Sequence, residues 1–391
     1  MNLFTSAQKI KRDSYYGAGQ DPNAYGLTND LSWVAGAQYA YSFDKLLFMS
    51  SDFTVGTEYN YNKLTDEQLA YERQINQEMN IKSIFLQNEW KNKALSLLMG
   101  LRYDKHNLIE KPIFSPRVNL RYNPKEWVNF RASYAEGFRA PQAFDEDLHL
   151  TAVGGVVQII VLDPELKPEH SRSYSVSADF YRNFGKVQTN LLVEGFYTEI
   201  DDVFYLEEAG VDATGQTQLM RKNGSGAVVK GINFEGKAIP SVKTNIQAGF
   251  TIQQSLYKEA ESWSENPNLL PRREMFRSPN LYGYLTTSYN PLKQMTVALS
   301  GTYTGSMLVQ HYGVEVDDDT EVWTPDFFDL GLKLSYDFKL SKGAKLQLNG
   351  GIQNIFNSFQ QDFDTGETRD AGYMYGPSLP RSFYAGLKLN L

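Results

Sequence analysis

Apolar and polar residues alternate along most of this chain with a period of two, and this alternation limits the possible folds more than any other feature. It is clearest over residues 330–340. The even positions there are Leu330, Leu332, Leu334, Tyr336, Phe338 and Leu340, and the odd ones are Gly331, Lys333, Ser335, Asp337 and Lys339. Successive side chains of a β-strand point to opposite faces of its sheet. Residues 330–340 therefore predict a strand with one apolar and one polar face.

No run of apolar residues approaches the roughly 18 that a membrane helix needs. Aromatic residues nevertheless reach 14%, with 25 Tyr and 23 Phe, while charged residues make up only 21%. A chain that crosses a membrane without such helices has to close its strands into a barrel, because an open sheet edge cannot face lipid. Only every second strand residue then touches lipid, which agrees with a negative mean hydropathy. The composition favours a transmembrane β-barrel.

The connections between the expected strands alternate between short turns and long loops, for about sixteen strands in all. Meandering barrels of the outer membrane have short periplasmic turns and long extracellular loops. A soluble β-sandwich has no reason to place all its long loops on one side. The fold class we predict is therefore all-β, an antiparallel transmembrane β-barrel whose chain ends at the periplasm. The expected turns include Ser42–Lys45, Phe184–Lys186 and Leu340–Gly343, and the expected loops include Asp13–Asn29, Thr65–Asn76, Ala140–Lys167 and Phe359–Ser378.

The first residues are the weakest part of this pattern. Met1–Lys11 alternates poorly and predicts only a weak, partial strand, and Met1–Tyr16 has no apolar core of a secretory signal. An exported barrel needs such a signal. The expectation from the sequence is that the chain begins late, either as a fragment of a longer protein or at a misplaced start.

Three segments resemble one family. Residues 134–141 read Tyr-Ala-Glu-Gly-Phe-Arg-Ala-Pro, residues 166–169 read Leu-Lys-Pro-Glu, and residues 351–357 read Gly-Ile-Gln-Asn-Ile-Phe-Asn. Their order and spacing resemble the barrel of TonB-dependent outer-membrane receptors. Such receptors are similar in having a barrel of 22 strands and an N-terminal plug domain. The resemblance implies that residues 1–391 form one domain, a partial barrel of about 16 of these strands, with the plug and the first strands missing.

The resemblance also implies a function and its partners. A receptor of this family sits among the lipids of the outer membrane of a Gram-negative bacterium. It imports a scarce, bulky nutrient, for which we expect an iron chelate or haem, with cobalamin as a further possibility. Energy comes from the TonB complex, which would act on this protein through the missing N-terminal part. The resemblance implies no cofactor that the barrel itself would hold.

Several other functions are disfavoured by composition. The formal net charge of −8 and the lack of a basic, aromatic patch argue against nucleic acid. The chain has no cysteine and no catalytic motif such as H-E-x-x-H or G-x-S-x-G, so we do not expect an enzyme. The acidic run Asp317–Glu321 lacks the ligand spacing of a calcium-binding EF-hand and is expected to be a solvated loop.

Two residues near the first motif are candidates for ligand binding. His149 lies in the expected loop between residues 138–141 and 163–166. Haem receptors resembling this chain carry a histidine between two similar boxes, and imidazole is a good axial ligand for haem iron. His149 would thus be a metal ligand only if the transported molecule is haem; otherwise it is a surface histidine. Arg139 has two interpretations, an anchor for an anionic ligand or an ion pair with Glu136 or Asp145 that holds the loop.

Aromatic residues in or beside the long loops form a second set of candidates. These residues suit stacking on a flat ligand, although anchoring at the bilayer interface is the ordinary role of such aromatics. The apolar run Val153–Leu162 is expected to form a small hairpin or to pack against a ligand. The aromatic candidates are Trp263, Tyr312, Trp323 and Tyr373, with Tyr375 beside them.

Two other classes of function compete with a receptor. One is a self-contained diffusion porin of about sixteen strands. It would need an inward loop with opposed charges, and no loop of this sequence has that pattern. The other is an outer-membrane hydrolase, for which no set of nucleophile, histidine and acid is recognisable.

Overall fold

The structure is a computed structural model of the chain. It describes residues 1–15, 25–69, 72–143, 151–153, 156–211, 217–313, 318–340, 343–366, 369–370 and 372–390. Within these ranges the ordered elements are 23 β-strands. None of the described segments is a helix of the length and apolarity required to cross a membrane.

The main sheet contains 17 strands and is antiparallel throughout. Its strands pair in chain order, and the three-residue strand β16 pairs alongside β15. The strands are β1 (Asn2–Tyr15), β2 (Tyr25–Leu46), β3 (Met49–Gln68), β4 (Arg73–Lys91), β5 (Leu95–His106), β6 (Ile113–Lys125), β7 (Val128–Arg139), β10 (Glu169–Phe184), β11 (Val187–Asp201), β14 (Ala227–Ser241), β15 (Thr244–Glu261), β16 (Arg272–Glu274), β17 (Leu281–Leu292), β18 (Met295–Thr304), β21 (Phe327–Lys339), β22 (Lys345–Gln353) and β23 (Ser382–Asn390).

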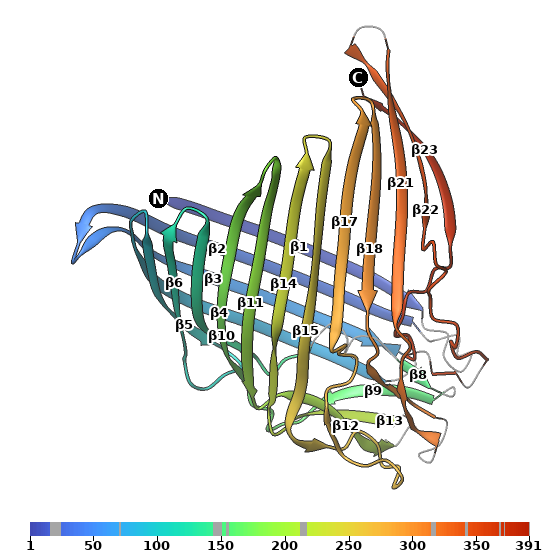
Figure 1. Ribbon diagram of the computed structural model, residues 1–391. Coiled ribbons are helices and arrows are strands. Elements are labelled where there is room, and N and C mark those ends of the chain that lie inside the picture. The colour runs from blue at the N-terminus through green and yellow to red at the C-terminus, as the bar shows by residue number, and fades with distance from the viewer. Residues whose placement is uncertain are drawn as a thin grey trace.

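The sheet is strongly curved, so that β1–β4 cross behind the strands from β10 onward (Figure 1). Short turns lie at one end of the strands, which we call the turn end, and the longer connections lie at the other, the loop end. In the part of the chain that the structure describes, β1 pairs only with β2, and β23 pairs only with β22. The sheet thus has two free edges.

Two small sheets lie at the loop end. One has four strands, β8 (Thr151–Val153), β9 (Val156–Leu162), β12 (Phe204–Val211) and β13 (Thr217–Asn223). The strands β8 and β9 form the hairpin expected within residues 153–162, and β9 pairs in parallel with β13. The other small sheet is the pair β19 (Leu308–His311) and β20 (Thr320–Trp323). The first of these sheets ties together two connections that are far apart in sequence.

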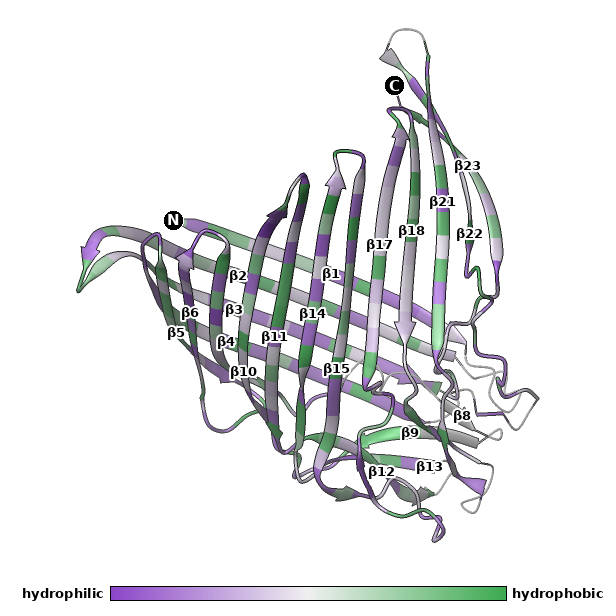
Figure 2. Cartoon of the chain, in the orientation of Figure 1, coloured by the Kyte–Doolittle hydropathy of each residue, from purple (hydrophilic) through white to green (hydrophobic). Residues whose placement is uncertain are grey.

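The register separates the residues of the main sheet into two faces. On one face, Leu332 lies opposite Leu299 and Ile352, and Ile352 lies opposite Phe383. Leu334, Tyr336, Leu387 and Leu389 belong to the same face by the same pairings. Lys333, Asp337, Lys388 and Asn390 lie on the opposite face, as the alternation predicts. Figure 2 shows the resulting bands of apolar and polar residues along the strands.

The polar face is the inner one. Ala143 follows β7, yet it exchanges two hydrogen bonds with Gln77 on β4, three strands away in the sheet. The chain after β7 therefore crosses the concave side of the sheet. Gln77 and Ile81 share a face of β4, and following the pairings strand by strand from Ile81 to β21 places Lys333 on this inner face and Leu334 on the outer face.

The structure corrects four expectations from the sequence. Ser42–Lys45 is not a turn, because β2 runs to Leu46 and the turn lies at Leu47 and Phe48. Both described ends of the expected loop Asp13–Asn29 are strand, because β1 extends to Tyr15 and pairs with β2 from Tyr25. Residues 2–15 form a full strand, paired with β2 along its whole length, rather than a weak partial one. Residues 65–76 are not a loop, because β3 continues to Gln68 and β4 begins at Arg73. Polar residues at these strand ends need not form a loop, because the two strands continue to pair with each other there.

Candidate functional site

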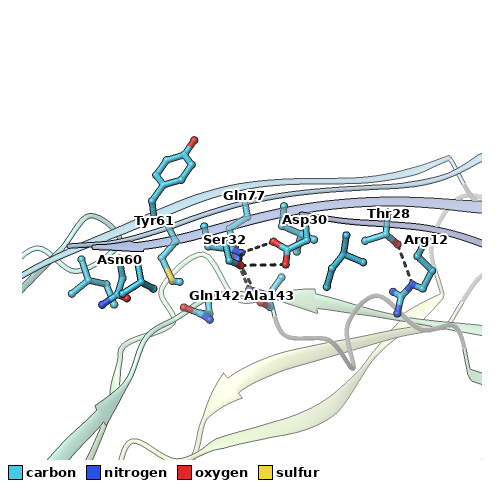
Figure 3. A pocket seen from close by; sticks show the side chains of 15 residues that line it. Arg12, Thr28, Asp30, Ser32, Asn60, Tyr61, Gln77, Gln142 and Ala143 are labelled. Carbon is cyan, nitrogen blue, oxygen red and sulfur yellow. Dashed lines mark hydrogen bonds between the residues drawn. The ribbon is translucent and has the colours of Figure 1, made fainter. Parts of the chain in front are cut away.

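A cavity of about 480 Å³ lies on the inner face of the first four strands, and we call it the wall cavity. Its walls come from β1, β2, β3 and β4, and residues Gln142 and Ala143 cover it. Figure 3 shows Asp30, Ser32 and Gln77 on the side of these covering residues, whereas Tyr61 points away from them. The wall cavity is therefore formed between the curved sheet and the chain that follows β7.

Apolar side chains form much of the wall cavity, although this face of the sheet is otherwise polar. Leu64 is only 8% exposed. The strand pairing places it opposite Asp30 and Gln77, so apolar and polar side chains are mixed along one row. The other apolar members are Ile10, Val34, Met79 and Ile81. The wall cavity therefore combines apolar and polar side chains on a face that is otherwise polar.

Polar groups of the wall cavity are held in fixed positions by hydrogen bonds. Thr28 donates through Oγ1 to Oδ1 of buried Asp66 at 2.5 Å. Asn62 donates to Asp30 at 2.5 Å and to Ser32 at 3.0 Å. A ligand in this cavity would meet carboxylate and amide oxygens whose positions are already set, which lowers the entropy cost of binding.

The covering segment is anchored by a small apolar core. Phe138 at the end of β7 packs against Ile109, Ile113 and Ala140, and its ring contacts the imidazole of His106. His106 is 1% exposed, and its Nδ1 accepts a hydrogen bond from the amide of Leu108 at 3.0 Å. This packing fixes where the chain leaves β7 and hence where residues 140–143 enter the lumen.

A second cluster joins three connections at the loop end, those that follow β15, β18 and β22; we call it the loop cluster. Three of the aromatic candidates meet there, together with Tyr375, whose ring centroid is 5.2 Å from that of Tyr373. Trp263 and Tyr312 contact with ring centroids 5.1 Å apart, and Tyr373 stacks on His311 at 3.9 Å. Trp263 is 7% exposed and Tyr373 is 4% exposed. These side chains are buried between loops, and in this conformation they present little surface to a ligand.

Polar contacts complete the loop cluster. Arg277 donates to the carbonyl oxygens of Gly372 and Met374, both at 2.8 Å. His311 Nε2 lies 2.6 Å from Oδ2 of Asp364. Burial and the nearby carboxylate of Asp362, which accepts a hydrogen bond from the phenol, raise the pKa of Tyr373 to about 12. The loop cluster is thus a packed unit rather than three independent loops.

The remaining candidates lie elsewhere. Arg139 ends β7; its guanidinium is 4.0 Å from Glu169 and lies over the ring of Phe204 at 5.5 Å. Glu136 instead accepts a hydrogen bond from Tyr134. Trp323 ends β20 and is 54% exposed. His149 and Asp145 lie outside the described residues.

Among the described residues, no group of three or more His, Asp or Glu side chains is placed to hold a metal ion. The structure thus brings together Trp263, Tyr312 and Tyr373 but not Arg139 or Trp323. The wall cavity was missed from the sequence. A signal for it was present: Leu64, Met79 and Ile81 are apolar at positions that the register assigns to the lumen.

Comparison with known proteins decides the family. Residues 2–355 match the model of the family described as "TonB dependent receptor-like, beta-barrel". The chain belongs to this family. TonB-dependent receptors are outer-membrane barrels of Gram-negative bacteria, and they are transporters rather than enzymes.

Individual TonB-dependent receptors resemble this chain at low identity. Heme/hemopexin utilization protein C of Haemophilus influenzae (strain 86-028NP) is 21% identical over 279 residues, which are 68% of this chain and 38% of that protein. The siderophore receptor PirA of Pseudomonas aeruginosa has a TM-score of 0.67 and 14% identity, over 100% of this chain and 64% of PirA. The ferric enterobactin receptor PfeA of Pseudomonas aeruginosa, in complex with BCV-L6, has a TM-score of 0.69 and 18% identity, over 98% of this chain and 59% of PfeA.

The chain spans less than two thirds of the length of these relatives, between 38% and 64%. The similarity to PirA and PfeA establishes the fold of the barrel, an antiparallel sheet of 17 strands.

Proposed function

We propose that this chain is the barrel portion of a receptor that imports an iron chelate or haem across the outer membrane, with energy supplied by the TonB complex. The family match over residues 2–355 is the observation that carries the proposal. The names of similar proteins support the ligand class, since they include siderophore receptors and a heme/hemopexin utilization protein. Cobalamin remains a further candidate of the same size class.

The wall cavity supports capture of such a molecule. Iron chelates and haem are too bulky for passive pores, and they combine apolar rings with polar or charged edges. Small-molecule sites are mostly apolar, occupy about 300–1,000 Å³ and carry a few fixed polar groups. The wall cavity has this composition, with Leu64 and Met79 beside Asp30 and Asn62.

Coupling to TonB requires parts beyond this barrel portion, and we propose that a plug domain and further strands complete the receptor. The two free edges of the sheet support this proposal. They also disfavour a self-contained porin, because a porin of these strands alone would pair β1 with β23.

Ligand titration of the purified chain in detergent tests the proposal. Haem and a ferric catecholate chelate are each added while tryptophan fluorescence is recorded, and one of them should bind saturably. Leu64→Gln, which places a polar group among the apolar residues of the wall cavity, should weaken binding about tenfold or more, as the loss of a buried apolar contact predicts. Lys63→Gln is the control, because Lys63 is the neighbouring residue on the opposite face.

Two results would contradict the proposal. One is that neither haem nor the chelate binds saturably. The other is that Leu64→Gln and Lys63→Gln weaken binding equally, since the site would then not be the wall cavity. Far-ultraviolet circular dichroism of both variants shows whether the sheet is intact.

A further inference from the structure

Two arginines lie directly opposite each other on the inner face, near the turn end. Arg121 on β6 pairs in register with Arg131 on β7. Like charges that are directly opposite on neighbouring strands destabilise a sheet. The turn that joins these strands follows Lys125, so the pair lies close to the turn end and far from the loop cluster. Opposite charges or hydrogen-bond acceptors nearby would be needed to compensate this repulsion.

The described side chains do not supply full compensation. Arg131 is 3.8 Å from Asp179, a long ion pair, and Asp179 already accepts hydrogen bonds from Tyr181 and Asn190. In the part of the chain that the structure describes, Arg121 makes no ion pair, and its Nε is buried without a hydrogen-bond partner. A buried donor left without a partner carries a desolvation cost.

A cavity of about 420 Å³ is lined by both arginines. Hydroxyl groups surround them: Ser96 pairs in register with Arg121, and Ser177 pairs with Arg131. Ser133 and Ser175 line the same cavity. Guanidinium and hydroxyl groups together form the donor set that binds carboxylates and phosphates.

Two carboxylates also line this cavity, and both have partners of their own. Glu89 accepts a hydrogen bond from Ser96 at 2.6 Å and lies 3.9 Å from the ammonium of Lys91. Glu194 accepts a hydrogen bond from Asn233 at 3.1 Å. They reduce the positive charge around the arginines, but neither forms an ion pair with Arg121 or Arg131 among the described residues.

We propose that Arg121 and Arg131 form a binding site for a small oxyanion, a carboxylate or phosphate group, on the lumen wall near the turn end. The oxyanion accepts hydrogen bonds from both guanidinium groups and from serine hydroxyls other than that of Ser96, which donates to Glu89; this satisfies Arg121 Nε and removes the repulsion between the arginines. This inference goes beyond the proposed function, because it does not depend on which nutrient the receptor captures at the wall cavity.

The site can be tested on the whole chain in detergent at low ionic strength. Sodium phosphate, trisodium citrate and, at matched ionic strength, sodium chloride are titrated by calorimetry and by the thermal unfolding midpoint. Phosphate or citrate should bind saturably and raise the midpoint, and chloride should not. Binding of either phosphate or citrate would support the proposed site. The tighter of the two shows whether the site prefers a phosphate or a carboxylate. Arg121→Gln and Arg131→Gln should each weaken binding about tenfold or more, the effect of losing a charge-assisted hydrogen bond.

The repulsion between Arg121 and Arg131 can be tested independently, through the thermal unfolding midpoint of the variants. Without an oxyanion, both variants should unfold at the same or a higher temperature than the unmodified chain, because each removes one of two opposed charges. Arg182→Gln is the matched control: Arg182 also lies near the turn end, but the register places it on the face opposite Arg131, and its guanidinium is 5.9 Å from the ring centroid of Trp127. The proposal would be overturned by equal effects of all the anions, by equal losses in Arg182→Gln, or by a lower midpoint of the oxyanion-free variants.

Discussion

Tyr373 illustrates how a single residue stabilises the loop cluster. Its ring is 4% exposed and stacks on His311, and its hydroxyl lies 3.3 Å from Oδ2 of Asp362. The phenol is neutral in this setting, because ionisation would place a second negative charge beside Asp362. The same contacts that make the side chain a poor ligand surface make it a good connection between two loops.

Tyr373 should therefore ionise at a higher pH than a tyrosine that is exposed to water. Burial and Asp362 raise its pKa to about 12, above the ordinary tyrosine value of about 10. A group whose pKa is raised in the folded state stabilises that state below the unfolded value, and this contribution is lost as the pH rises through the folded value. The absorbance at 295 nm is recorded against pH for the unmodified chain and for Tyr373→Phe. The difference between the two curves reports the ionisation of Tyr373 and should be centred near pH 12. A difference centred near pH 10 would mean that the phenol is free in water.

Gly351 should tolerate no side chain. A Cβ at this position would lie 2.2 Å from the carbonyl oxygen of Leu332, which belongs to the neighbouring strand. Gly351→Ala should therefore destabilise the sheet by about 1–3 kcal/mol, the usual cost of overpacking. Gly195→Ala is the control, because nothing lies within 4 Å of a Cβ there. Urea unfolding of both variants measures the difference, and equal stabilities would refute the close approach.

The strand β21 tests which face of the whole sheet is the outer one. Leu334 is 43% exposed on the outer face, and Lys333 lies on the inner face. Leu334→Arg should cost about 2–4 kcal/mol in a bilayer, as for cations on the lipid face of barrels, while Lys333→Ala should change stability far less. Unfolding by urea from lipid vesicles gives both values. If the two substitutions were tolerated equally, the outer face would not be in contact with lipid.

Strands and their order were predictable from the sequence because their signal is local. The alternation over residues 330–340 predicted β21, and the turn at residues 184–186 was found between β10 and β11. The ends of β3 and β4 were missed for a physical reason. Residues 65–68 read Thr-Asp-Glu-Gln, so odd and even positions are both polar, and hydrogen bonds such as that from Thr28 to Asp66 satisfy the inward-facing carboxylate. Alternation cannot reveal a strand there.

The candidate site was less predictable, because it depends on contacts between distant residues. Nothing near Trp263 in the sequence shows that Tyr312 will cover it, and nothing near Ala143 shows that Gln77 will bind it. The parallel pairing of β9 with β13 is of the same kind. Only the apolar residues at lumen-facing positions, such as Met79, could have indicated the wall cavity before the structure was known.

The whole sheet, with its two free edges, should not transport alone. Unpaired N–H and C=O groups facing lipid cost several kcal/mol each. We therefore expect the chain, expressed with an added signal peptide, to show no uptake of haem or ferric chelate that depends on the TonB complex. Radiolabelled iron uptake, with and without an energy poison, measures this. Saturable, energy-dependent uptake would show that these strands close and work without a plug.

Turns at one end and loops at the other give this molecule unequal tolerance to changes in length. One residue inserted between Leu46 and Met49 would shift β3 by one position, so that every side chain of the strand would change faces, with Phe53 turned to water and Asp52 to lipid. The same insertion between Arg139 and Glu169 would be absorbed, because a long connection can lengthen at small entropic cost. Over evolutionary time, residues can be gained and lost at the loop end, while the turn end keeps its length.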